Sequence, residues 1–177
     1  ALQGLRDTGA VEPGQEVLII GAGGGVGTFA VQVAKELGCR VAAVCSTAKL
    51  DLVRSLGADH AIDYTREDFT RGEQRYDLIL QLAGTASPST CRRALTPTGT
   101  LALSSGEGRF AGIDRILRAL VSSPFVRQRL RPFLTKETTE DLVTLAGLVE
   151  AGKVTPVIDR IYPLSGVPDA IVYLEEG

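Results

Sequence analysis

The stretch from Glu16 to Leu37 constrains the fold more than any other part of the chain. It opens with four consecutive apolar residues at 17–20, mostly β-branched, which is typical of a parallel strand buried on both faces. Five glycines follow within seven residues, and apolar side chains then recur at the spacing of an amphipathic helix that Gly38 would end. A buried strand, a glycine turn and a helix form the first half of a dinucleotide-binding βαβ unit.

Glycine serves three purposes in such a turn: the chain reverses tightly, a phosphate reaches the bare backbone, and the helix packs closely on the strand. The N–H groups at the helix start and the positive end of the helix dipole then hold a pyrophosphate. Aligned to the spacing G/A-x-G-x-x-G, the loop places Ala22, Gly24 and Gly27 at the motif positions. The alternative is a structural glycine turn in another α/β fold.

The rest of the chain alternates between strand and helix patterns. Further strands are expected at 40–45, 58–64, 76–82 and 100–104, with a candidate at 157–161. Helices are expected at 47–56, 87–94, 113–121, 139–151 and 167–174, and a turn at 97–99. This alternation predicts an α/β fold with a doubly wound parallel sheet and right-handed crossovers. We interpret the arginines at 127, 129 and 131 as a solvated face or a partner contact.

Composition excludes several classes of function. A net charge of −2 without basic blocks gives no indication of nucleic acid or an anionic membrane as a partner, and no apolar run is long enough to span a bilayer. Cys39, Cys45 and Cys91 lack the spacing of metal ligands, so we expect small core residues in a reducing, cytoplasmic compartment. The single histidine, His60, is expected to be structural, and neither a metal site nor a strong general acid or base is predicted.

The end of the second strand indicates which dinucleotide is bound. NAD sites place an Asp or Glu there for the ribose hydroxyls, but the sequence at 44–49 is VCSTAK, without an acid. A hydroxyl and an ammonium attract a 2′-phosphate, so Ser46 and Lys49 favour NADP(H), and Tyr64 could contact the same phosphate. The alternatives are an ordinary exposed lysine and a surface tyrosine.

Three runs of residues together indicate a known family. They are GAGGGVGTFAVQVAKELG, VCSTAKLDLVRSLGADHAIDYTREDF and LVEAGKVTPVIDRIYPLSGVPDAIVYLEEG. The chain resembles the medium-chain dehydrogenase/reductase superfamily over essentially its whole length, in particular its zinc-independent quinone oxidoreductase branch. The resemblance implies a Rossmann domain with strand order 3-2-1-4-5-6 that binds NADPH. In such a family, hydride passes from the nicotinamide to a quinone or an activated alkene, and the protein mainly supplies orientation.

The resemblance also implies a set of cofactor-binding residues. The pyrophosphate loop corresponds to Ala22, Gly24, Gly25, Val26 and Gly27. The 2′-phosphate contacts correspond to Ser46, Lys49 and Tyr64, and the adenosine ribose and pyrophosphate pass Leu82, Ala83 and Gly84. The nicotinamide lies near Leu103 and Ser104.

Some features depart from the family pattern. Many relatives carry Asp where this chain has Gln81. An N-terminal GroES-like, β-rich substrate domain and a final strand are missing, and both ends look cut, so residues 1–177 are expected to be one cofactor domain. Two functions therefore remain open: the cofactor domain of an oxidoreductase, or a nucleotide-binding or NADPH-sensing module without turnover. Relatives often dimerise through sheet edges, which implies a homodimer through 100–104 or 157–161.

Overall fold

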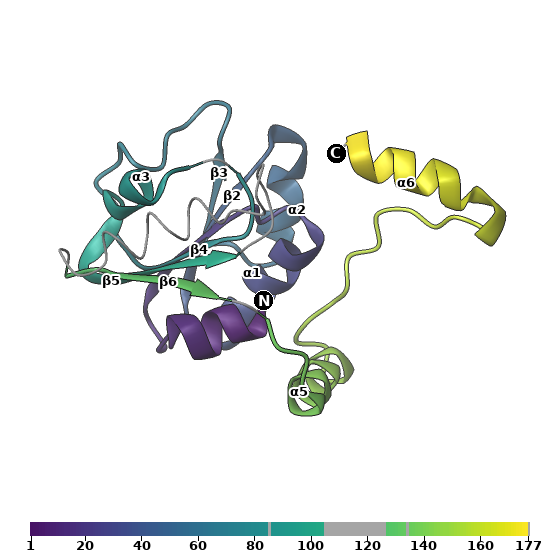
Figure 1. Ribbon diagram of the computed structural model, residues 1–177, viewed down its shortest axis with the longest axis horizontal. Helices are drawn as coiled ribbons and strands as arrows, with labels where there is room; N and C mark the ends of the chain where they lie inside the picture. Colours follow the sequence, from purple (N-terminus) through teal and green to yellow (C-terminus); the bar gives the residue numbers. More distant parts are fainter. Residues whose placement is uncertain (85, 105–126, 134, 177) are drawn as a thin grey trace.

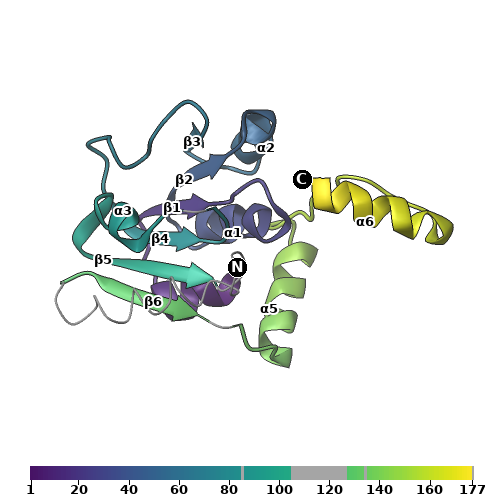
Figure 2. The same ribbon diagram turned by 45° about the horizontal axis from the view of Figure 1, so that its top comes forward.

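The computed structural model describes residues 1–84, 86–104, 127–133 and 135–176, and these contain one six-stranded parallel sheet (Figure 1). The strand order is β3-β2-β1-β4-β5-β6, as the family resemblance implied, and Figure 2 shows the strands side by side in this order. The strands are β1 Glu16–Ile20, β2 Arg40–Cys45, β3 His60–Asp63, β4 Tyr76–Gln81, β5 Leu95–Ser104 and β6 Arg129–Phe133. The α/β doubly wound fold is confirmed.

Helices and helical turns connect or flank these strands. They are η1 Gly4–Gly9, α1 Gly25–Glu36, η2 Thr47–Lys49, α2 Leu50–Ser55, α3 Pro88–Arg92, α5 Thr139–Glu150, η4 Leu164–Gly166 and α6 Val167–Glu176. The predicted helix at 113–121 lies outside the described residues. Among the helices that are described, none has the length and apolar character needed to cross a membrane.

The central strands are buried on both faces, which explains their unbroken apolar runs. In β1, Val17 and Ile19 belong to one hydrophobic cluster, and Leu18 and Ile20 belong to the cluster on the other face. The first cluster also contains residues of η1 and α1, and Leu145 and Leu148 of α5 pack against it. All three cysteines are buried in these clusters, as predicted.

The sixth strand is not the one that the sequence indicated. We expected a strand at 157–161, but that segment is irregular, and β6 lies where we saw only a basic cluster. Within β6, Leu130 and Phe133 are buried whereas Arg129 and Arg131 are exposed. An edge strand needs few apolar residues, and here the two buried ones are separated by Arg131 and Pro132, so no strand pattern was visible in the sequence. The β-branched residues at 157–161 have no strand to pair with in the described parts of the chain.

Both predicted dimer edges are consequently wrong. Residues 100–104 pair with β4 on one side and with β6 on the other, so β3 and β6 are the edges of the sheet. The strand β5 also begins at Leu95 rather than at Thr100. The turn expected at 97–99 lies inside β5. There the pairing of β5 with β4 shifts in register, between Tyr76 and Leu78 of β4.

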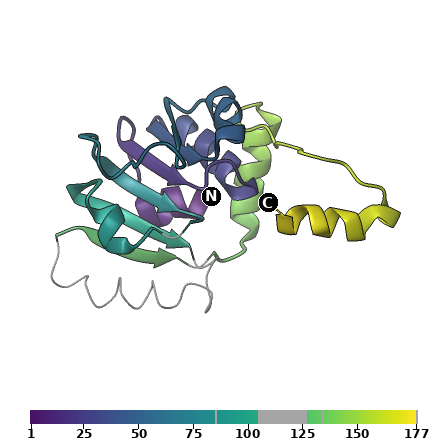
Figure 3. The same ribbon diagram turned by 90° about the horizontal axis from the view of Figure 1, so that it is seen from above.

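Beyond α5, residues 153–176 form what we call the C-terminal arm. It begins on α1, continues as an extended segment and ends in α6, which stands apart from the sheet and its helices (Figures 1 and 3). Val154 is 1% exposed within the first hydrophobic cluster, so the start of the arm is packed against the body. Further along, Ile161 and Leu164 are almost fully exposed.

Candidate functional site

The candidate site lies at the carboxyl ends of β1 and β4, where the strand order reverses. From β1 the chain proceeds to β2 on one side, and β4 lies on the other side. Such a switch point leaves a crevice outside the carboxyl ends of the strands, which is where open α/β sheets bind ligands. In Figure 2 the arrowheads of β5 and β6 point to this edge, on the side where α6 lies.

The loop after β1 can be built only from very small residues. Gly21 has a φ of +88°, and a Cβ there would lie 2.7 Å from the Cβ of Ala83 at the end of β4. At Gly27 a Cβ would lie 2.1 Å from the carbonyl oxygen of Gly21 and 2.6 Å from the Cα of Ala22. Ala22 is fully buried, and its N–H donates to the carbonyl of Val44 at 3.0 Å. These contacts press α1 against the loop, as the motif requires.

The start of α1 is open and offers donors. Gly24 is the N-cap and has no side chain to cap the helix. The N–H groups of Gly25, Val26 and Gly27, in the first turn, have no acceptor within the helix. A Cβ at Gly25 would meet nothing within 4 Å, and Gly24 and Gly25 are both exposed. Bare backbone, unused N–H groups and a positive helix end fit an anionic group of the size of a phosphate.

A second group of predicted residues lies beside this loop, at the ends of β2 and β3. Ser46 follows β2, and the side chain of Lys49 rests against the loop, since a Cβ at Gly23 would lie 2.9 Å from the Cβ of Lys49. Tyr64 follows β3, its N–H donates to the carbonyl of Cys45 at 3.3 Å, and its side chain is 63% exposed. The fold thus brings three residues from two connections to one edge of the sheet.

A buried carboxylate that sequence reasoning missed holds these connections together. Thr47 donates to Asp63 at 2.5 Å, and the hydroxyl and backbone N–H of Thr65 donate to the same carboxylate at 2.7 and 2.9 Å. Asp63 is only 7% exposed, and the hydrogen bonds from Thr47 and Thr65 hold the pKa of its carboxyl below the ordinary value. A polar residue ending an apolar strand was the available signal.

A second missed residue comes from the C-terminal arm. The ammonium of Lys49 lies 3.3 Å from a carboxylate oxygen of Asp159, and Tyr173 of α6 donates to the other oxygen at 2.7 Å. Hydrogen bonds from Tyr173 and from Lys49 lower the pKa of the Asp159 carboxyl. No local pattern could have indicated this contact, because the two residues are 110 positions apart.

The remaining predicted residues line the ends of β4 and β5. The N–H of Leu82 donates to the carbonyl of Ile20 at 3.0 Å, and Gly84 has a φ of +83°. Leu103 is 1% exposed, so only its backbone can face a ligand, whereas Ser104 is half-buried at the strand end. Gln81, which stands where relatives carry Asp, is fully buried and donates to the carbonyl of Ala86 at 3.1 Å.

Two cavities lie away from the glycine loop, and the single histidine lines one of them. His60 is exposed on β3, in a cavity of about 360 Å³ at the amino ends of the strands that also includes Arg40 and Tyr76. A second cavity of about 400 Å³ lies between η1, the end of β6 and the start of α5. Neither contains the glycine loop. The described residues hold no cluster of His, Cys, Asp and Glu that could bind a metal, and the absence of metal from the protein stays a prediction.

Comparisons with known proteins give a consistent result. A family profile described as "Zinc-binding dehydrogenase" matches residues 56–177. The chain is 34% identical to a 2-methylene-furan-3-one reductase from Solanum lycopersicum over 100% of this chain and 41% of that protein. It is 35% identical to an NADPH-dependent alkenal/one oxidoreductase, described as chloroplastic, from Arabidopsis thaliana, over 92% of this chain and 38% of that protein.

A solved structure is similar over the whole chain. The quinone oxidoreductase from Coxiella burnetii superimposes with a TM-score of 0.85 and 29% identity, covering 99% of this chain and 53% of that one. The chain spans less than half the length of the two curated relatives.

Proposed function

The chain belongs to the zinc-binding dehydrogenase family of the medium-chain dehydrogenase/reductase superfamily, and on this basis we propose that it is the NADP(H)-binding domain of an oxidoreductase. The observation that carries the proposal is the open, uncapped start of α1 beside a loop that admits only very small residues. When bound, the nicotinamide cofactor supplies hydride for a quinone or an α,β-unsaturated carbonyl.

The chain's own part in this function is to bind and orient the dinucleotide. The first-turn N–H groups of α1 would donate to the pyrophosphate, and the close fit of Gly21 and Gly27 keeps those donors fixed. The ends of β4 and β5, at 82–84 and 103–104, would lie along the ribose and nicotinamide. Proteins of this kind need not move a proton themselves in order to orient a hydride donor.

Charge supports NADP(H) over NAD(H). Lys49 is held against the loop, and the hydroxyl of Ser46 and the exposed ring of Tyr64 lie at the same edge. An ammonium and two hydroxyls favour a 2′-phosphate, which NAD lacks. The acceptor class comes from relatives whose names describe furanone, alkenal/one and quinone reductases. A chain that covers less than half of such relatives also leaves a module that binds NADPH without turnover as a second candidate.

A titration tests the proposal. We expect purified chain to bind NADPH more tightly than NADH, measured by the fluorescence of the reduced nucleotide, and we expect Lys49→Glu to remove most of the difference. Equal binding of both nucleotides would reject Ser46, Lys49 and Tyr64 as selectivity residues, and binding of neither would contradict the proposed function. Oxidation of NADPH with quinone and enone acceptors then separates the oxidoreductase from the module.

A further inference from the structure

The end of β2 lacks the acid that NAD-binding sites usually place there, but the fold supplies an acid from elsewhere. The carboxylate of Asp159 lies 3.3 Å from the ammonium of Lys49, whose side chain rests on the glycine loop. Lys49 is 40% exposed and Asp159 is 51% exposed, so the pair lies at the surface where a nucleotide could reach it.

The contact between Lys49 and Asp159 is supported by the attachment of the arm to α1 at Thr155, four residues before Asp159. The side-chain amide of Gln32, in the middle of α1, accepts from the N–H of Thr155 at 2.8 Å and donates to the carbonyl of Thr155 at 3.1 Å. Gln32 is 8% exposed, and beside it Val154 is buried and Lys153 pairs with Glu36. The helix that carries the phosphate donors therefore also fixes the segment that carries Asp159.

The other side of the Asp159 carboxylate is also held. Tyr173 donates to it at 2.7 Å, and the guanidinium of Arg160 stacks 4.0 Å from the centre of the Tyr173 ring. One hydroxyl from the arm and one ammonium from the loop edge therefore contact the two oxygens of this carboxylate. It stands beside the ammonium that would attract a 2′-phosphate.

We propose that Asp159 is a specificity-determining residue that reduces the preference of this site for NADP(H) over NAD(H). This inference rests on the proposed function. While Asp159 pairs with Lys49, the net charge of the pair is zero, so a 2′-phosphate meets a neutralised lysine and a like charge. The 2′-hydroxyl of NAD(H) suffers no such repulsion and can donate a hydrogen bond to the carboxylate. The C-terminal arm thus sets cofactor selectivity together with the glycine loop.

The test measures the dissociation constants of NADPH and NADH for the whole chain and its variants. Asp159→Asn keeps the shape of the side chain and an acceptor for Tyr173 but removes the charge. We expect it to raise the preference for NADPH about fivefold at low salt, with the gain shrinking at about 1 M salt, where surface charges are screened. Asp159→Glu should stay close to the wild type. The matched control is Asp169→Asn, which makes the same change of charge at an exposed position on α6.

A second pair of variants tests the route through Lys49. In a Lys49→Ala background, Asp159→Asn should raise the preference for NADPH less than in the wild type, because no lysine charge is released and only the direct effect of the Asp159 carboxylate on the nucleotide is lost. An unchanged ratio in Asp159→Asn, or an equal gain in Asp169→Asn, would overturn this inference while leaving the proposed function standing. Failure of the wild type and every variant to bind either nucleotide would overturn the proposed function and this inference with it.

Discussion

Gly25 and Gly27, at the start of α1, have very different surroundings. At Gly27 a Cβ would lie 2.1 Å from the carbonyl oxygen of Gly21, whereas at Gly25 it would meet nothing within 4 Å. The three atoms nearest to a Cβ at Gly27 are all backbone atoms of Gly21 and Ala22, which cannot rotate away as a side chain can. Gly27 is therefore a packing position, and we propose that Gly25 is a binding position.

This difference predicts that replacement by alanine changes a different property at each position: stability at Gly27 and nucleotide binding at Gly25. Gly27→Ala should lower the free energy of unfolding by about 3 kcal/mol, at the upper end of what overpacking costs. Gly25→Ala should leave stability within about 0.5 kcal/mol of the wild type but weaken nucleotide binding, because a methyl group would cover the phosphate donors. Urea unfolding and nucleotide titration of both variants measure this. Equal loss of stability in the two would contradict the geometry.

Asp63 predicts a specific dependence of stability on pH. Hydrogen bonds from Thr47 and Thr65 depress the pKa of its carboxyl in the folded protein. A depressed carboxyl pKa contributes stability that is present above the unfolded value, about 3.9, and is lost as pH falls through the folded value. Asp63→Asn should therefore lose stability at pH 7 and show a shallower decline between about pH 4 and pH 2.

Urea unfolding across this range measures the effect. The control is Asp51→Asn, whose carboxylate is 99% exposed and pairs with Arg54 on the same helix. An exposed pair of this kind contributes little, so the control should follow the wild-type curve. If Asp63→Asn declined as steeply as the wild type, the hydrogen bonds to Asp63 would not stabilise the fold.

At the residue scale, the sequence predicted the positions that a known motif encodes, whereas Asp63 was missed although a local signal for it existed. The glycine spacing located the loop, and the position after β2 located Ser46 and Lys49. Asp159 could not be found in this way, because its contact with Lys49 depends on how the arm crosses α1. The binding roles of these residues remain predictions that the titrations test.

At the scale of elements, the buried strands were predictable and the edge was not. The strand predicted at 40–45 has the bounds of β2, and the apolar run at 17–20 lies within β1, since both strands are apolar along almost their whole length. In β6 only Leu130 and Phe133 are buried, and Pro132 and two arginines conceal the strand. Dimerisation stays a prediction, and light scattering of the purified chain tests it. Because β6 is an edge of the sheet, it replaces 100–104 as the candidate strand for the contact.

The attachment of the arm to α1 gives a prediction for this element. Gln32→Ala removes both hydrogen bonds to the backbone of Thr155, so the N–H of Thr155 should exchange with solvent roughly tenfold faster. Hydrogen exchange followed by NMR measures this, with Gln74→Ala at an exposed position as the control. An unchanged rate at Thr155 would mean that the arm is held by its apolar contacts alone.

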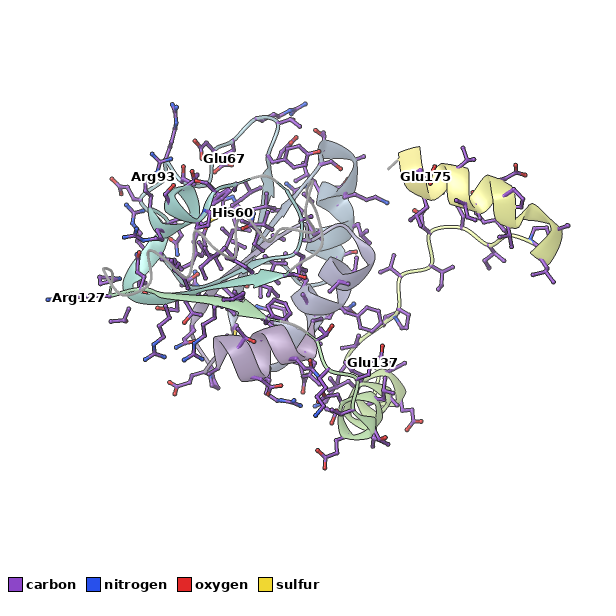
Figure 4. All side chains as sticks on the ribbon, viewed as in Figure 1. His60, Glu67, Arg93, Arg127, Glu137 and Glu175 are labelled. Atoms are coloured by element: carbon purple, nitrogen blue, oxygen red, sulfur yellow. The ribbon has the colours of Figure 1, made fainter. Side chains whose placement is uncertain are left out.

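At the scale of the whole molecule, the two ends of the chain differ in how they are packed. Leu2 and Leu5 near the start are buried on the sheet, whereas α6 stands apart with Ile171 and Leu174 exposed (Figure 4, where Glu175 marks this helix). The sequence correctly predicted the helix, because helical periodicity is local. The position of α6 relative to the sheet could not be predicted in this way, because it depends on contacts between residues far apart in the sequence.

The measurement that tests the account most directly is an NMR titration of the ¹⁵N-labelled chain with NADPH, because it shows where the nucleotide binds. We expect the largest chemical-shift changes at the amides of residues 24–27, with further changes at Ser46 and Tyr64. A titration in which the changes gather instead at Arg40, His60 and Tyr76, around the cavity at the amino ends of the strands, would contradict it.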